Sequence, residues 1–185
     1  MLELAILGLL KERSMHGYQL KKSVSENLGA FWQVSYGSLY PALKRLQKEG
    51  AVEMVFPRED VRRRKNVYRL TALGEKIFNE LAQSSRHDLN DENGFRIRLA
   101  FFRHLKPEAR LGVLERRKAY LNERLQTLKS RLSSYAERVD NYTLSLMRHG
   151  MDTTEHDIAW LDGLIRQERR SVRSRRAQKT RGRTK

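Results

Sequence analysis

The residues best suited to bind a charged partner are four consecutive cations, Arg62–Lys65. They precede an alternating apolar run, "NVYRLTALG", that ends in threonine, alanine, leucine and glycine. Cationic side chains at the tip of a hairpin are suited to lie along a nucleic-acid backbone or in a minor groove. The alternative is an ordinary solvated loop, and the neighbouring elements decide between these two interpretations.

Catalytic and metal-binding motifs are not found in this sequence. The chain has no cysteine, which excludes disulfides, thiolate ligands and a cysteine nucleophile. Its five histidines form no close ligand pair such as HExxH, and there is no GxSxG motif or phosphate-binding glycine loop. His16 is expected to satisfy the turn between the first two helices. We therefore expect no enzyme activity, no metal site and no cofactor.

The charge balance favours a polyanionic partner. The 185 residues include 38 Lys and Arg against 22 Asp and Glu, a net charge of +16. Such an excess favours DNA, RNA or an anionic membrane surface. The apolar opening "MLELAILGLL" carries Glu3 and meets three charged residues directly afterwards, which argues against a signal peptide or membrane span. We expect a cytoplasmic protein.

Hydrophobic periodicity predicts three helices, two strands and a fourth helix in the first 83 residues. The helices are expected at 2–12, 18–29, from 35–38 to 50, and 72–83, and the strands at 51–56 and 67–70. Gly29 is expected to end the second helix, Pro41 to lie in the first turn of the third, and Thr71 to cap the fourth. Ile77 and Leu81 are expected on one apolar face of the fourth helix.

Three sequence stretches resemble the signatures of a known family. Three helices followed by a strand, a basic loop and a strand are the order of a winged helix-turn-helix. "MHGYQL", "GSLYPALKRLQKEG" and "RRRKNVYRLTALG" resemble, in order and spacing over residues 1–83, the signature stretches of the PadR family of bacterial transcriptional regulators. The family often has Gly and Pro before the "YRLT" strand, where this chain has "RRRKN". The resemblance therefore does not determine the type of turn in the wing.

The resemblance implies a function and an assembly. It implies a homodimer held by C-terminal helices, which binds a palindromic operator in double-stranded DNA, usually as a repressor. It also implies release by a small hydrophobic or phenolic effector. The candidate effector pocket consists of aromatic residues, whose alternative role is a dimer core: Trp32, Phe95, Phe101, Phe102 and Trp160.

Candidate DNA contacts fall on the third helix, on the residues around it and on the basic loop. Leu39, Leu43 and Leu46 recur at core spacing, so the opposite face is exposed, small near its start and cationic further along. Such a face suits entry into a major groove. Hydroxyls suit phosphate and base contacts, although the tyrosines could equally brace the helices. The predicted DNA-binding residues are Tyr18, Ser35, Tyr36, Gly37, Ser38, Tyr40, Lys44, Arg45, Lys48, Arg62, Arg63, Arg64 and Lys65.

The C-terminal half is predicted to be a helical, coiled-coil-like dimerisation domain at 107–170, after a connecting segment with a short helix at 84–106. Apolar residues alternate by three and four from Leu111 to Leu146, with Lys118 as the exception. A final helix at 153–170, after a break between His149 and His156, adds a second stripe. We expect this seam to be covered both within the chain and by a second subunit. The predicted dimerisation residues are Leu114, Leu121, Leu125, Leu128, Leu132, Tyr135, Val139, Ile158, Leu161 and Ile165.

Residues 171–185 form a basic tail with almost no apolar content, and we expect it to be disordered. The predicted fold class is mainly α with a small β-wing: an N-terminal winged helix-turn-helix at 1–83 and a C-terminal helical dimerisation domain. The competing hypothesis is a basic coiled-coil nucleoid or architectural protein that binds DNA without sequence preference. A membrane-surface role would need an amphipathic helix with a clean basic face, which the sequence lacks.

Overall fold

The structure is a computed structural model that describes residues 1–29, 32–55, 66–84, 91–135 and 138–181, with the side chains of the last helix described up to residue 175. The chain divides into two compact units, Met1–Leu105 and Lys106–Lys185. Both are largely helical, and the β-structure of the described residues is a small three-stranded antiparallel sheet in the first unit. The predicted fold class, mainly α with a small β-wing, is confirmed.

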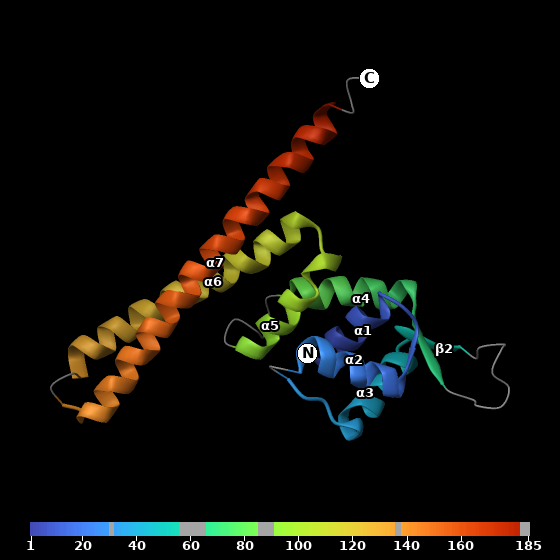
Figure 1. Ribbon diagram of the computed structural model, residues 1–185, viewed down its shortest axis with the longest axis horizontal. Coiled ribbons are helices and arrows are strands. Elements are labelled where there is room, and N and C mark those ends of the chain that lie inside the picture. Colours follow the sequence, from blue (N-terminus) through green and yellow to red (C-terminus); the bar gives the residue numbers. More distant parts are fainter. Residues whose placement is uncertain (30–31, 56–65, 85–90, 136–137, 182–185) are drawn as a thin grey trace. The chain divides into compact units, whose positions relative to one another are not determined.

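The first unit contains the helices and strands predicted for residues 1–83, with ends that differ from the prediction by at most two residues (Figure 1). One strand was not predicted, because it has two residues and its pairing with β3 is a tertiary contact. The sheet order is β1-β3-β2, with Met15 opposite Tyr68 and Val52 opposite Leu70. The elements are α1 (Leu2–Leu10), β1 (Met15–His16), α2 (Gly17–Leu28), α3 (Tyr36–Lys48), β2 (Val52–Val55), β3 (Val67–Leu70), α4 (Ala72–Gln83), α5 (Glu92–Ala100) and the 3₁₀ helix η1 (Phe102–His104).

The core of this unit is built around α1, which contacts α2, α3, α4 and β3. Every residue from Leu4 to Leu10 is buried, as expected for a helix that other elements surround. The α3 leucines predicted to face the core are each at most 1% exposed. On α4 the buried residues are Gly74, Phe78 and Ala82, whereas the predicted Ile77 and Leu81 are half-buried. The apolar face is therefore one residue further along, because the large ring of Phe78 occupies its centre.

Local hydrogen bonds fix the ends of these helices. The Thr71 hydroxyl oxygen accepts from the Gly74 amide at 3.0 Å, so the predicted cap of α4 is confirmed. Gly50 has a φ of +75°, in the left-handed region that glycine favours, and it ends the α3 region as predicted. Gly29 follows the last residue of α2, so that helix ends where predicted, although its φ of −60° is right-handed. Pro41 is misplaced by the prediction, because it lies inside α3 beyond the first turn, where the Gly37 carbonyl loses its i+4 donor at an exposed position.

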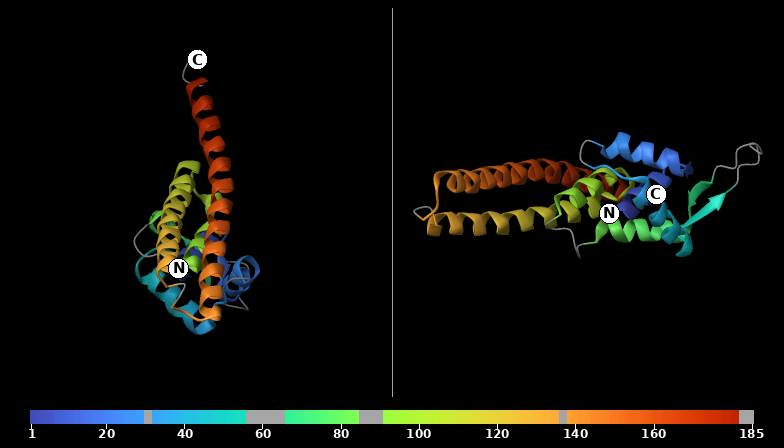
Figure 2. Two further views of the ribbon diagram at one scale, coloured as in Figure 1. Left: turned by 90° about the vertical axis from the view of Figure 1, so that its left-hand side faces the viewer. Right: turned by 90° about the horizontal axis from the view of Figure 1, so that it is seen from below.

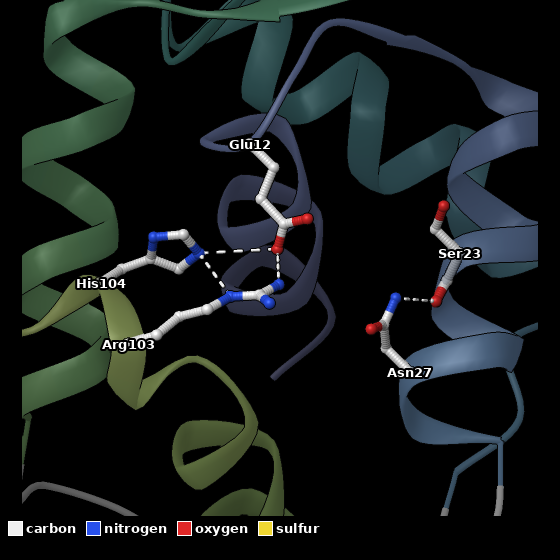
Figure 3. A network of polar contacts seen from close by, with 5 residues as sticks. All are labelled: Glu12, Ser23, Asn27, Arg103 and His104. Carbon is white, nitrogen blue, oxygen red and sulfur yellow. Dashed lines mark hydrogen bonds and ion pairs between the residues drawn. The ribbon is translucent and has the colours of Figure 1, made fainter.

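A polar cluster joins the end of α1 to η1 (Figure 3). The Glu12 carboxylate pairs with Arg103 and lies 3.6 Å from His104 Nε2, which accepts a hydrogen bond from Arg103 Nε at 3.3 Å. The His104 ring stacks on Phe101 and meets the edge of Phe78. Burial, then the charges of Arg103 and Lys11, lower the pKa of His104. The Glu12 carboxylate, which would favour a protonated imidazole, is also paired with Arg103.

The second unit is an antiparallel pair of long helices, α6 (Pro107–Tyr135) and α7 (Asn141–Arg181) (Figure 2). The ion pairs show this direction, because residues near the start of α6 pair with residues 168 and 169 of α7, and later residues of α6 pair with residues 162 and 155. The pairs are Arg110 with Glu168 at 3.2 Å, Glu115 with Arg169 at 2.8 Å, Lys118 with Asp162 at 2.6 Å, and Lys129 with Glu155 at 2.8 Å. Lys118, the exception in the predicted seam, thus has an acidic partner on the facing helix.

Three expectations for the C-terminal half are wrong. The seam is not one helix from Leu111 to Leu146, because α6 ends at Tyr135 and Asp140 starts α7 by accepting from the amides of Tyr142 and Thr143. There is no break between His149 and His156, since α7 is continuous through Gly150. The basic tail is helical as far as Arg181, which its Arg, Gln, Lys and Ala residues favour intrinsically.

Candidate nucleic-acid interface

The outer face of α3 combines small, hydroxyl and cationic side chains on a rigid helix. Its three core leucines and Ala42 fix the rotation of the helix, so the opposite face points outward. Near the N-terminus the exposed positions include Gly37 and Ser38 beside two tyrosines, and toward the C-terminus they include Lys44 and Lys48. Hydroxyl-bearing side chains followed by cations suit a helix that enters a major groove and places ammonium groups near phosphates or guanine edges.

The first turn of α3 is tied by two serines. Ser35 is the N-cap: its hydroxyl oxygen accepts from the Ser38 amide at 3.2 Å and lies 3.1 Å from the Ser38 hydroxyl. Ser38 Oγ also donates to the Ser35 carbonyl at 3.0 Å. Both serines are exposed, so each hydroxyl keeps hydrogen-bonding capacity for an outside partner. The caps explain why the helix starts here and hold the hydroxyls in fixed positions.

Two tyrosines form an exposed aromatic surface on the same helix. The rings of Tyr36 and Tyr40 stack with centroids 6.1 Å apart, and the side chains are 39% and 48% exposed. Lys21 of α2 places its Nζ 3.8 Å from the centre of the Tyr36 ring, a cation–π contact. The sequence did not predict a role for Lys21, because its contact with α3 is a tertiary contact that hydrophobic periodicity cannot reveal.

The glycine in "MHGY" allows α2 to approach Tyr40. A Cβ at Gly17 would lie 2.8 Å from both Cε1 and the hydroxyl of Tyr40, closer than van der Waals contact allows. His16, the residue before it, caps α2: its Nδ1 accepts from the Gln19 amide at 3.2 Å, and Gln19 Oε1 accepts from the His16 amide at 3.1 Å. The predicted structural role of His16 is therefore confirmed. Tyr18, exposed over 62% of its surface, follows in the first turn of α2.

Charges around the interface are partly paired. Arg45 of α3 lies 3.2 Å from the Glu3 carboxylate of α1, and both side chains are exposed. At the base of the wing, Arg69 of β3 pairs with Glu53 of β2 at 2.9 Å. Burial, and then the Tyr40 hydroxyl, raise the pKa of Tyr68, which lies on β3 opposite Met15 of β1 and Met54 of β2. The predicted wing cations Arg62–Lys65 lie outside the described residues.

The predicted effector pocket divides between the two units. Phe95, Phe101 and Phe102 are buried in the first unit, where Phe101 packs edge-on against Phe78 with centroids 6.4 Å apart. Trp32 is half-buried in the same unit, and Trp160 is exposed over 44% of its surface on α7 of the second unit. Phe101 is thus a core residue of the first unit.

The predicted dimerisation residues also differ in burial. Those buried within the single chain are Leu114, Leu121, Leu125, Leu161 and Ile165. Leu128, Leu132 and Ile158 are half-buried, Tyr135 is exposed, and Val139 lies in the turn between the helices rather than on a seam. The α6–α7 contact therefore covers part of the predicted seam within one chain.

Comparison with known proteins identifies the family of this interface. Residues 6–80 match the model of the transcriptional regulator PadR-like family. Over these residues, about two fifths of the chain, the sequence is PadR-like. This family consists of transcriptional regulators rather than enzymes, which confirms the expectation that the chain is not an enzyme. A second model, named virulence activator alpha C-term, matches residues 93–168.

Individual relatives are similar over different parts of the chain. The negative transcriptional regulator PadR of Bacillus subtilis is 33% identical over 79 residues, 43% of this chain and 43% of that protein. The match therefore spans less than half the length of this curated relative. The crystal structure of Bacillus subtilis PadR in complex with operator DNA is 20% identical, with 90% of this chain and 98% of that chain covered and a TM-score of 0.42. A PadR-like regulator from Bacillus cereus is 17% identical, with 92% and 99% covered and a TM-score of 0.42.

The described residues contain no group of three or more His, Asp or Glu side chains that could hold a metal ion. Nor does any helix in the part of the chain that the structure describes combine the length and apolar character needed to cross a membrane.

Proposed function

We propose that this chain is a homodimeric transcriptional repressor of the bacterial cytoplasm that binds a palindromic operator in double-stranded DNA, with the outer face of α3 in the major groove. The observation that carries the proposal is the arrangement on α3. Three fully buried leucines orient a face that carries Gly37 and the hydroxyls of exposed serines and tyrosines near its start, with Lys44 and Lys48 further along. Family membership adds that related chains regulate transcription.

The contacts divide into two classes under this proposal. Ser35, Ser38 and the exposed tyrosines supply hydroxyls close to the leading end of α3, where base edges are reached, and Lys44 and Arg45 follow as cations. The wing cations Arg62–Lys65 supply sequence-independent phosphate contacts. Replacing Arg62, Arg63 and Arg64 by alanine should thus weaken binding to operator and unrelated DNA alike and flatten the salt dependence by about 0.9 for each lost contact.

The experiment is selection of bound duplexes from a random pool by the full-length protein. A dimeric repressor should enrich a pseudo-palindrome whose half-sites lie about 10–10.5 base pairs apart, or a multiple of that spacing. Lys44→Ala should then cost about 1–3 kcal/mol if the side chain reads a base, with relaxed preference at one position. Lys76→Ala, an exposed cation of α4, is the control with the same change of charge. Selection that enriches no sequence would favour an architectural DNA-binding protein instead.

The dimer is supported by apolar side chains that the single chain leaves exposed at one end of the α6–α7 pair. Tyr135 is exposed over 51% of its surface, Tyr142 over 90% and Leu146 over 70%. These residues continue the predicted seam beyond the part that α6 and α7 bury against each other. A second subunit that covers them would bury apolar area in proportion to its contact.

A small hydrophobic or phenolic effector is the last part of the proposal. A structure of Bacillus subtilis PadR contains p-coumaric acid, which makes this compound a suitable probe. Release of the selected operator by p-coumaric acid, measured by fluorescence anisotropy, would support an effector of this class. Unchanged operator affinity at a saturating concentration would exclude p-coumaric acid as the effector. Variants at Phe95 and Trp160 would test whether the predicted pocket residues take part in any release.

A further inference from the structure

The last part of α7 carries a concentration of positive charge on a regular helix. Residues 166–181 contain eight Lys and Arg and one acidic residue, Glu168. Of these cations, Arg166, Arg170 and Arg173 are spaced by four and three residues and are all exposed. We name these three residues the arginine stripe. At about 100° per residue they fall within roughly 60° of one another around the helix.

Another side of this segment is buried. Leu161, Ile165 and Val172 are each at most 8% exposed and share one side of α7, which packs against α6. The arginine stripe lies roughly a third of a turn away from that side. Packing therefore fixes the rotation of the helix, and the stripe is held outward by the same residues that hold the helix in place.

The stripe keeps its charge because nearby acids are engaged elsewhere. Glu168 turns toward α6, where it pairs with Arg110 at 3.2 Å and has a side chain only 14% exposed. Glu115 of α6 pairs with Arg169, the neighbour of the stripe, at 2.8 Å. Among the residues that the structure describes, no carboxylate pairs with Arg166, Arg170 or Arg173. The segment thus presents three guanidinium groups without a counter-charge.

The spacing of these groups matches a phosphate backbone. Seven residues of helix separate the outer members of the stripe, about 10 Å along its axis. Over the same length one strand of DNA presents about three phosphates. A membrane surface fits less well, because an interfacial helix needs an apolar face to insert. In residues 166–181 the apolar side chains are Val172, which is buried, and Ala177.

We propose that the arginine stripe is a second DNA-binding surface, which contacts the phosphate backbone without reading sequence. This inference rests on the proposed function, in which the first unit binds the operator. The stripe adds affinity for any duplex and leaves the choice of sequence to α3. It requires no fixed placement of the second unit relative to the first, since backbone contacts are available along the whole duplex.

The test is neutralisation of the stripe in the full-length protein. Glutamine retains helix propensity and removes the charge, so the variant is Arg166→Gln, Arg170→Gln and Arg173→Gln together. Its affinity for both the selected operator and an unrelated duplex should fall by on the order of tenfold or more at about 0.1 M salt, with their ratio unchanged. The slope of log affinity against log salt should shrink by about 0.9 for each lost phosphate contact.

A matched variant separates a local contact from a change of net charge. Arg124→Gln, Arg131→Gln and Arg148→Gln remove the same charge from exposed positions nearer the other end of the α6–α7 pair. Their salt slope should stay at the unmodified value, and circular dichroism should show both triple variants folded. An unchanged affinity in the stripe variant would overturn the inference, as would an equal loss in the matched variant.

The partner and the underlying proposal are tested separately. If sedimentation with phosphatidylserine vesicles depended on the stripe while DNA binding did not, the surface would be a membrane site and the inference would be wrong. If the unmodified protein bound all duplexes equally and the stripe variant lost that binding, the proposed operator recognition would fail while the stripe stood. If the stripe variant kept both its operator preference and its normal affinity, the stripe would fail while operator recognition stood.

Discussion

The ion pair between Arg45 and Glu3 makes a prediction that distinguishes a DNA-reading arginine from a structural one. Arg45 Nη2 lies 3.2 Å from Glu3 Oε1, and the side chains are 59% and 37% exposed. A guanidinium that contacts DNA from α3 must leave this carboxylate or share it with a phosphate or base. Glu3→Gln removes the competing charge, so we expect the variant to bind the operator more tightly than the unmodified protein.

The size of the effect follows from the exposure of the pair. Exposed ion pairs contribute about 0.2–1 kcal/mol, because water screens the attraction and the side chains lose freedom. Released on DNA binding, that free energy corresponds to a gain of roughly 1.4- to 5-fold in affinity, since about 1.4 kcal/mol is tenfold. The same figure bounds the loss of folding stability, so the melting temperature should fall by at most a few degrees.

The assay is fluorescence anisotropy with the selected operator, together with thermal unfolding. Glu26→Gln is the control, because Glu26 pairs with Lys22 at 3.7 Å on α2 and its removal makes the same change in net charge. In an Arg45→Ala background, Glu3→Gln should give no gain beyond that control. Equal gains from Glu3→Gln and Glu26→Gln, or a gain that survives without Arg45, would refute the reasoning and leave Arg45 as a partner of α1 only.

Three further predictions follow from the packing and the charges. Gly17→Ala places a methyl group against the Tyr40 ring. Operator affinity measured by anisotropy should drop several-fold, while the helix content measured by circular dichroism stays the same. Unchanged affinity would show that the position of this ring is unimportant for binding. Burial and two neighbouring cations lower the pKa of His104 below its ordinary 6.5. As the pH drops below about that value, the unfolded chain takes up the proton first, so the free energy of unfolding should fall. In urea unfolding at several pH values His104→Phe should flatten this dependence, and parallel profiles of the two proteins would contradict it. Tyr142→Asp with Leu146→Asp should convert dimer to monomer in sedimentation without loss of helicity, because both side chains are exposed in the single chain; a variant that stays dimeric would place the subunit contact elsewhere.

Hydrophobic periodicity predicted the helices and strands that have a regular spacing of apolar residues, and it could not predict the others. The spacing of Leu39, Leu43 and Leu46 fixed both the existence of α3 and its exposed face, because a core of fully buried leucines leaves one rotation of the helix. The two-residue strand β1 has no periodicity, and it exists because Met15 and His16 meet β3. The same limit explains the broken seam: alternation by three and four continues past Tyr135, although the chain turns before α7 begins.

Charge patterns show the corresponding limit for the candidate site. A count of Lys and Arg locates the basic segments, but it cannot tell which cations are already neutralised. Arg45 and Arg169 pair with carboxylates distant in sequence. Glu168 lowers the net charge counted for its segment, but its carboxylate pairs with Arg110 of α6 and does not neutralise the exposed arginines. The available charge of a surface therefore depends on tertiary contacts that cancel some cations and leave others. Among the cations that keep their charge are Lys44 and Lys48 on α3 and the arginine stripe on α7, each on a helix whose buried face holds it in place.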